Sequence, residues 1–142
     1  MDKETEFLEY IYQNAKMGII GIDNIKEAIK DESLLKTIKE QERDYYNICT
    51  KATNLLLDKD QKVKDVSGMA KIMTKIDAKL NTKEETSNNT IAKMMIKGSN
   101  KGIMEIQEKL NNYRDVDKKI TALAKELLNI EKRNLDNFKK FL

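Results

Sequence analysis

The sequence predicts an all-α protein, an antiparallel four-helix bundle made of two helical hairpins. The 142 residues are 39% hydrophobic and 36% charged, with no proline and five glycines, a composition typical of long amphipathic helices. Apolar residues recur at steps of three and four, which is the spacing of one helix face. The two halves of the chain also carry matching patterns. A chain of this length is ordinary for one domain, predicted here over residues 1–142.

The first hairpin is predicted over residues 4–58. Its first helix runs from about Glu4 to Lys30, and Asp31 caps a second helix that ends near Asp58, because an aspartate carboxylate accepts from the free amides of a first helical turn. The first apolar stripe comprises Leu8, Ile11, Ala15, Gly18, Ile22, Ile25 and Ile29. The second comprises Leu34 or Leu35, Ile38, Gln41, Tyr45, Ile48, Ala52 and Leu55. So short a turn makes the two helices antiparallel.

A crossover is predicted over residues 59–81 and a second hairpin over residues 82–142. The crossover contains a short helix with apolar residues at heptad spacing: Val66, Met69, Met73, Ile76 and Leu80. The third long helix begins either at a capping box over residues 82–85 or only at Ser87, because the residues after Ser87 are poor helix formers. Asp115 is predicted to cap the last helix. The third and last stripes comprise Ile91, Met95, Gly98, Gly102, Ile106, Leu110 and Tyr113, and Ile120, Leu123, Leu127, Ile130, Asn134, Phe138 and Phe141.

The two hairpins can be laid over each other, which indicates an internal duplication. In this alignment Gly18 meets Gly102, and the predicted caps Asp31 and Asp115 coincide. Heptad patterns align by chance, so the paired glycines and caps carry more weight than the apolar matches. A long crossover between two hairpins is the topology of ferritin-like bundles. A plain up-down-up-down bundle stays open as the alternative.

Charge and targeting features exclude several classes of function. The net charge is +3, with 27 basic and 24 acidic residues interleaved along the chain, whereas nucleic-acid binders concentrate Lys and Arg on one face. No apolar run has the length of a membrane span, and the N-terminus lacks the apolar core of a signal peptide. We therefore expect a cytoplasmic protein that binds neither nucleic acid nor membrane. Cys49 is the only cysteine and is interpreted as buried filler.

Polar residues on the predicted core stripes are the first candidates for a site. Gln41 and Asn134 fall on these stripes, and Glu131 lies beside Asn134. Buried amides must be hydrogen-bonded. They belong either to a central pocket or to a register-setting network in which they bond to each other or to a buried water, and the network is favoured.

Glycines inside the predicted helices are the second candidate feature. Gly18, Gly21, Gly98 and Gly102 each cost about 1 kcal/mol relative to alanine. Gly18 and Gly102 indicate either a close crossing of the first helices of the two hairpins or a small cavity for a ligand. Close packing is the favoured interpretation.

The sequence gives little support for a metal site or a catalytic site. A ferritin-like di-iron site uses Glu-x-x-His on two helices, and this chain has no histidine. The nearest remnants are Glu42-x-x-Tyr45, Glu126-x-x-Asn129 and Glu131-x-x-Asn134, with Glu27 and Glu105 at the edges of the first stripes. No catalytic, cofactor-binding or metal residues are predicted. Met94 is the methionine expected on the rim, where it would contribute to a homodimer or partner contact.

Three segments resemble an uncharacterised family of small Firmicutes proteins with a ferritin-like helical arrangement. They are IYQNAKMG (11–18), IAKMMIKGS (91–99) and LDNFKKFL (135–142). The resemblance spans nearly the whole chain, but its motifs carry no known activity. Members of the family often place His and Glu where this chain has Thr90 and Lys93, which implies that any ancestral ligand set is degraded here.

The function expected from the sequence is a non-enzymatic helical scaffold or protein-interaction protein, with a homodimer or another protein as partner. The alternatives are a ferritin-like metal-binding or redox protein with a degraded site, and a small-ligand binder in the bundle core.

Overall fold

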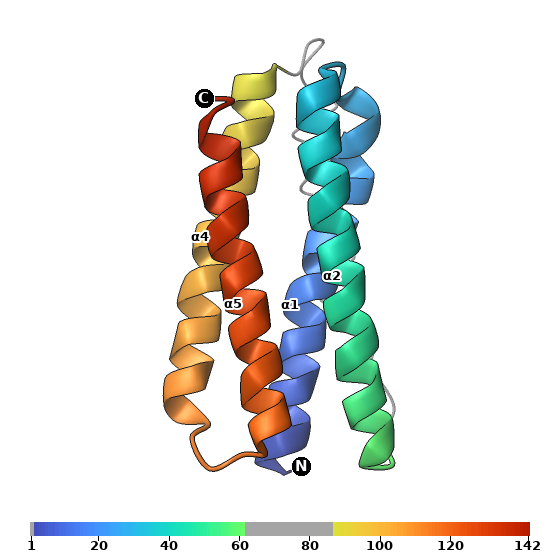
Figure 1. Ribbon diagram of the computed structural model, residues 1–142, viewed down its shortest axis with the longest axis vertical. Coiled ribbons are helices and arrows are strands. Elements are labelled where there is room, and N and C mark those ends of the chain that lie inside the picture. The colour runs from blue at the N-terminus through green and yellow to red at the C-terminus, as the bar shows by residue number, and fades with distance from the viewer. Residues whose placement is uncertain (1, 62–86) are drawn as a thin grey trace.

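A computed structural model describes residues 2–61 and 87–142. These residues form four long α-helices and one short 3₁₀ turn. The helices are α1 (Lys3–Ile25), α2 (Glu32–Asp58), α4 (Asn88–Asn112) and α5 (Lys118–Lys139), and the 3₁₀ turn is η1 (Lys26–Ala28). Figure 1 shows the helices lined up as one elongated bundle. The protein is all-α, and its four long helices pack as two hairpins.

The first hairpin begins and turns at aspartate caps. Asp2 accepts from the Thr5 amide at the start of α1, and Asp31 accepts from the Leu34 amide at the start of α2, each at 2.8 Å. The predicted cap Asp31 and the predicted end of α2 at Asp58 are confirmed. The α-helical part of the first helix stops earlier than predicted, because the chain tightens into η1 after Ile25.

The second hairpin confirms one predicted boundary and corrects another. Ser87 caps α4 by accepting from the Thr90 amide at 3.1 Å, so the later of the two predicted starts is confirmed. The prediction that Asp115 caps the last helix is wrong. Asp117 has that role and accepts from the Lys119 amide at 2.8 Å. A residue of the first hairpin also holds Asp117 in place: Glu4 of α1 accepts a hydrogen bond from the Asp117 amide at 2.6 Å.

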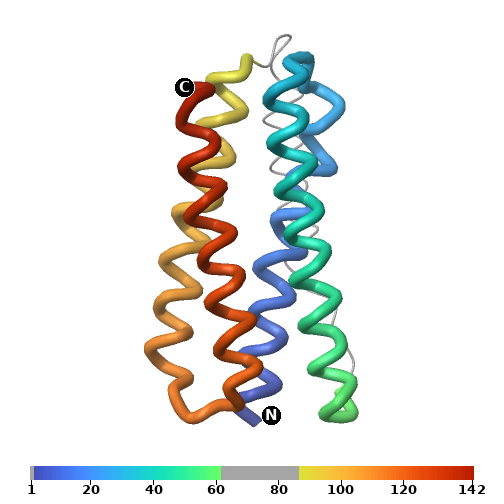
Figure 2. Tube along the Cα trace, viewed as in Figure 1, coloured from blue at the N-terminus to red at the C-terminus, as the bar shows by residue number. Residues whose placement is uncertain are grey.

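The helix directions follow from the chain ends and from pairs between helices. In Figure 1 α1 rises from the N-terminus, α2 and α4 descend, and α5 rises to the C-terminus; Figure 2 shows the same path in the Cα trace. Arg133 pairs with Asp44 and Lys51 pairs with Glu126, so residue numbers increase along α2 as they decrease along α5. The end of α2 and the start of α4 therefore lie at opposite ends of the bundle.

The hydrophobic core runs between the helices along the length of the bundle. Contacts within each hairpin outnumber those between the hairpins, where α2 and α5 meet most closely. Phe7 of α1 stacks on Tyr113 at the end of α4, with the ring centroids 5.0 Å apart. The largest fully buried side chains are Phe7, Phe138, Leu8, Ile11, Ile19, Ile22, Ile25, Leu34, Ile38, Ile48, Leu56 and Ile91.

None of the helices in residues 2–61 and 87–142 combines the length and the apolar character needed to cross a membrane. The predicted short helix with Val66, Met69, Met73, Ile76 and Leu80 lies outside the described residues, as does the capping box over residues 82–85. Met94, expected on the rim, is partly buried and packs against the core, and Met104 is the exposed methionine of α4, at 68%. Met104 lies on the side of the helix away from the α4 core residues Ile91 and Ile106.

Candidate functional site

The structure brings four polar side chains together in the middle of the bundle, and we call them the polar centre. Gln41 and Tyr45 come from α2, and Glu131 and Asn134 from α5. Their exposed fractions are 1%, 4%, 2% and 3%. In each pair the spacing of four or three residues places both side chains on one helix face. The polar centre therefore spans the line where the two hairpins meet.

Tyr45 is the hub of the polar centre. The Gln41 Nε2 group donates to the Tyr45 hydroxyl at 2.9 Å, and that hydroxyl donates to Glu131 Oε1. Within residues 2–61 and 87–142, Gln41 Oε1 and Asn134 Nδ2 are buried with no hydrogen-bond partner. The sequence predicted Gln41, Glu131 and Asn134 as a core network. In the structure two consecutive hydrogen bonds at the Tyr45 hydroxyl link Gln41 to Glu131.

Two glycines make room for the polar centre. The space in front of Gly18 is filled by the Tyr45 ring, which a Cβ atom at this position would overlap. A Cβ atom on Gly102 would lie 2.6 Å from Glu131 Oε2. The sequence suggested that Gly18 and Gly102 mark a crossing of the two first helices or a ligand cavity. In the structure each glycine instead accommodates a side chain from the second helix of its own hairpin, so the space that a pocket would need is occupied.

Burial sets the titration of the polar centre. Removal from water raises the pKa of Glu131 to about 7, and the hydrogen bond from Tyr45 acts in the opposite direction. The pKa of Tyr45 is raised well above its ordinary value, mainly by burial and then by the Glu131 charge. Among residues 2–61 and 87–142, no cationic side chain contributes to the pKa of Glu131. The carboxyl is therefore neutral in a substantial fraction of molecules near pH 7.

The other glutamates considered as remnants of a metal site face different partners. Glu42 pairs with Lys26 at 3.3 Å, Glu126 with Lys51 at 2.9 Å, and Glu105 accepts from the Tyr10 hydroxyl at 2.8 Å. Glu27 is exposed in η1. In the part of the chain that the structure describes, no three His, Cys, Asp or Glu residues are grouped so that they could hold a metal ion.

A shallow groove lies between α1 and α2, away from the polar centre. It has a volume of about 280 Å³, and its lining includes Tyr12, Ile19, Tyr46 and Cys49. The Cys49 thiol donates to the Tyr12 carbonyl oxygen at 3.8 Å. Burial raises the pKa of this thiol to about 11, so it stays protonated at neutral pH and is a poor nucleophile.

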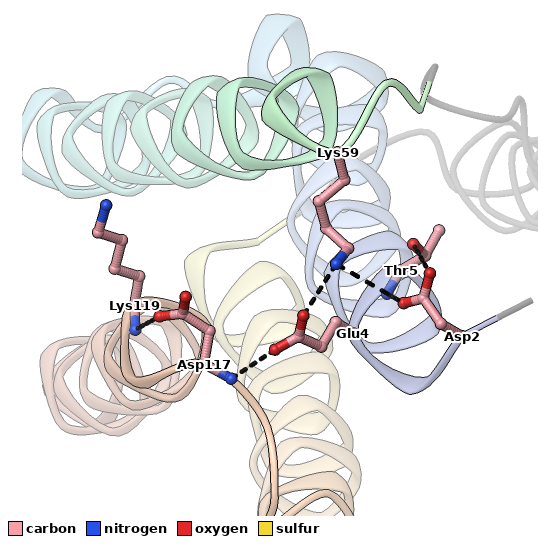
Figure 3. A network of polar contacts seen from close by, with 6 residues as sticks. All are labelled: Asp2, Glu4, Thr5, Lys59, Asp117 and Lys119. Carbon is pink, nitrogen blue, oxygen red and sulfur yellow. Dashed lines mark hydrogen bonds and ion pairs between the residues drawn. The ribbon is translucent and has the colours of Figure 1, made fainter.

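A polar network at one end of the bundle joins three helix termini, and we call it the end clasp (Figure 3). Glu4 of α1 accepts from Lys59 Nζ at 2.8 Å, and its other oxygen accepts from the Asp117 amide at 2.6 Å. Asp2 lies 3.9 Å from the same Lys59 ammonium. These contacts lower the pKa of Glu4, with the Lys59 hydrogen bond as the largest cause. The end clasp holds the end of α2 and the start of α5 to the start of α1.

Comparison with known protein families, curated proteins and solved structures finds no match to this chain. No family is therefore identified for this chain, and the resemblance to a Firmicutes family stays an expectation from the sequence. What the structure supports is the coarser description, a small all-helical protein with four long helices among its described residues.

Sequence reasoning missed two members of this region. Tyr45 was considered only as part of an apolar stripe and of the Glu42-x-x-Tyr45 remnant, and Asn14 was not singled out. Asn14 lies beside the site, with its Nδ2 atom 3.6 Å from the position of a Cβ on Gly102. The available signal was the glycine on each first helix, because a helical glycine often marks a bulky side chain on the neighbouring helix at the same level.

Proposed function

We propose that this chain is a non-enzymatic helical scaffold that works by binding another protein, with a second copy of itself as the first candidate partner. The observation that carries the proposal is the packing at Gly18 and Gly102, where Tyr45 and Glu131 take the space that a core ligand would need. A protein partner would therefore bind to the outer surface of the bundle. There Tyr46 is 48% exposed at the edge of the α1–α2 groove, and exposed aromatic side chains are frequent anchors of protein interfaces.

Sedimentation of the full chain over a wide range of concentrations tests this proposal. We expect reversible self-association that Tyr46→Glu weakens, because the substitution places a charge where the partner would pack. Met104→Glu is the matched control, since Met104 is an exposed apolar residue on α4. A chain that stays monomeric at every concentration, or that responds equally to both substitutions, rules out self-association through this groove.

Metal analysis tests the non-enzymatic part of the proposal against the metal-binding or redox alternative. The protein would be purified without chelator and its Mn and Fe content measured. We expect substoichiometric metal, because Glu42, Glu105 and Glu126 are held by partners of their own. One Mn or Fe per chain would overturn the scaffold function.

The topology proposed for this scaffold is ferritin-like. It is supported by the descent of both α2 and α4 in Figure 1 and by the antiparallel pairs Arg133–Asp44 and Lys51–Glu126, since a bundle of two hairpins with one long crossover has this order. A nitroxide on Lys39→Cys in a Cys49→Ser background tests it. The label should broaden amide signals near the end of α5. Broadening near the start of α5 would favour the up-down-up-down alternative.

A further inference from the structure

Glu131 is the single acidic side chain that is buried among the described residues, and no lysine or arginine is buried with it. Arg133 and Lys51, which pair with Asp44 and Glu126 across the same contact between α2 and α5, lie on the surface. A buried carboxyl without a cation is strongly disfavoured in its ionised form. Its protonation state therefore affects the contact in which it lies.

That contact joins the two hairpins. Glu131 belongs to α5, and the group that donates to it, the Tyr45 hydroxyl, belongs to α2 of the other hairpin. Glu131 Oε2 lies against Gly102 of α4, and the Asn14 amide of α1 lies near the same glycine. All four long helices thus contribute to the surroundings of one carboxyl. Any hydration of this carboxyl has to take place between the hairpins.

A line of polar groups leads from the surface toward Glu131 along the contact between α1 and α4. Glu105 of α4, which is partly exposed, accepts from the Tyr10 hydroxyl at 2.8 Å. Asn14 lies one turn further along α1, close enough to Tyr10 to affect its pKa, and its Nδ2 atom approaches Gly102. These side chains form a line of polar groups between the surface and the surroundings of Glu131.

The titratable groups around Glu131 are few. Tyr45 faces it from α2, Tyr10 lies beyond Asn14 on α1, and Glu105 lies one turn from Gly102 on α4. Neither tyrosine titrates near neutral pH, because the pKa of each is raised. Proton binding in this region at neutral pH therefore belongs to Glu131.

We propose that Glu131 is a proton-operated latch between the two hairpins, closed while the carboxyl is protonated and loosened when it ionises. In the closed state the neutral carboxyl accepts from Tyr45 and fits against Gly102. In the loosened state the carboxylate takes up water through the α1–α4 contact, and α2 and α5 separate locally around Tyr45 and Glu131. The surface pairs Arg133–Asp44 and Lys51–Glu126 keep the hairpins together during this opening.

Two measurements on the full chain test the latch. The first is an NMR titration of the Glu131 side-chain carboxyl carbon. We expect the Glu131 carboxyl to titrate near neutral pH. A midpoint for Glu131 in the ordinary glutamate range would overturn the proposal.

The second measurement is hydrogen exchange below and above that midpoint, corrected for the intrinsic pH dependence of exchange. Opening around Tyr45 and Glu131 should increase about tenfold or more at the higher pH, since each pH unit between the closed-state and open-state pKa is a factor of ten. Glu131→Gln should remove this increase, and Glu40→Gln, at an exposed glutamate of α2 outside the contact between the hairpins, should keep it. Equal opening at both pH values, or an increase that survives Glu131→Gln, overturns the latch. If Glu131→Gln does not fold, the wild-type titration and exchange still decide.

Discussion

At the residue scale, three glycines inside helices have different neighbours. A Cβ atom on Gly18 would overlap the Tyr45 ring, and one on Gly102 would meet Glu131, whereas Gly98 has nothing within 4 Å. The glycines that match in the alignment of the two hairpins therefore face different side chains, a tyrosine in the first hairpin and a glutamate in the second.

Alanine at these glycines should have opposite effects on stability. Gly98→Ala should increase the free energy of unfolding by about 1 kcal/mol, because alanine is the better helix former and the space is open. Gly18→Ala should lower it by about 1–3 kcal/mol, because the Tyr45 ring would have to move within a packed core. Urea unfolding measures both. A stabilising Gly18→Ala would show that the ring does not pack there.

Removing the Tyr45 hydroxyl should destabilise the protein more than removing that of its neighbour. Tyr45→Phe leaves both Gln41 Nε2 and Glu131 Oε1 without their buried partner, which costs about 1–3 kcal/mol. Tyr46→Phe is the matched control, because Tyr46 is half exposed, and a surface change of this kind stays within about 0.5 kcal/mol. Thermal or urea unfolding compares the two variants. Equal losses would remove Tyr45 from its role as hub.

Helical periodicity predicted which side chains face the core, and this placed Gln41, Glu131 and Asn134 inside. It could not pair Tyr45 with Glu131. Periodicity fixes the direction of a side chain on its own helix, whereas a partner on another helix depends on how far the two helices are shifted along the bundle axis. That shift is set by turn lengths and by contacts such as Glu4 to Asp117, which join distant parts of the chain.

At the element scale, helix boundaries were predictable where a side chain caps its own helix. Asp31 and Ser87 accept from amides three residues later, and this local chemistry is visible in sequence. Asp115 and Asp117 were not distinguishable in this way, since both are aspartates in the same loop. The start of α5 was decided by Glu4, which holds the Asp117 amide from another helix.

The end clasp should loosen when Glu4 loses its charge. Glu4→Gln replaces the carboxylate between Lys59 and Asp117, so the amides at the start of α5 should exchange a few-fold faster. The pKa of Glu4 is lowered, so its stabilising contribution is present above the ordinary glutamate value and is lost as the pH falls through the lower folded value. Hydrogen exchange near neutral pH and in acid measures both effects. Glu40→Gln, an exposed acid on α2, should leave the start of α5 unchanged.

At the scale of the whole molecule, the stripes and short turns predicted an all-α arrangement of two hairpins, and the structure confirms it. The order of the helices was less accessible, because a connection of this length can return along the bundle or turn back at once. Two long-range pairs show that α2 and α5 run in opposite directions, Arg133 with Asp44 and Lys51 with Glu126. In sequence these residues look like ordinary surface charges.

The buried Glu131 carboxyl should give the whole molecule an unusual dependence of stability on pH. Its folded pKa, about 7, lies above the ordinary value of 4.5, so the folded state binds the proton more tightly than the unfolded state. The contribution of Glu131 is therefore fully present below about pH 4.5 and is lost as the pH rises to about 7. Surface carboxyls with lowered pKa values, Asp2 and Glu4, act in the opposite direction, and a comparison with Glu131→Gln cancels their effect.

Urea unfolding of the wild type and Glu131→Gln at several pH values between 4 and 8 measures this contribution, at roughly 1.4 kcal/mol for each pH unit between the two pKa values. The stability of the wild type relative to Glu131→Gln should fall by about 3 kcal/mol across this range. Glu40→Gln, at an exposed glutamate of α2, should show no comparable trend against the wild type. A difference between wild type and Glu131→Gln that stays constant with pH would mean that the carboxyl is hydrated in the folded protein. The stability of the wild type relative to Glu131→Gln should fall as the pH approaches neutrality. The Glu131 carboxyl then ionises in the polar centre, where the Tyr45 hydroxyl donates to it and no described cation is buried beside it.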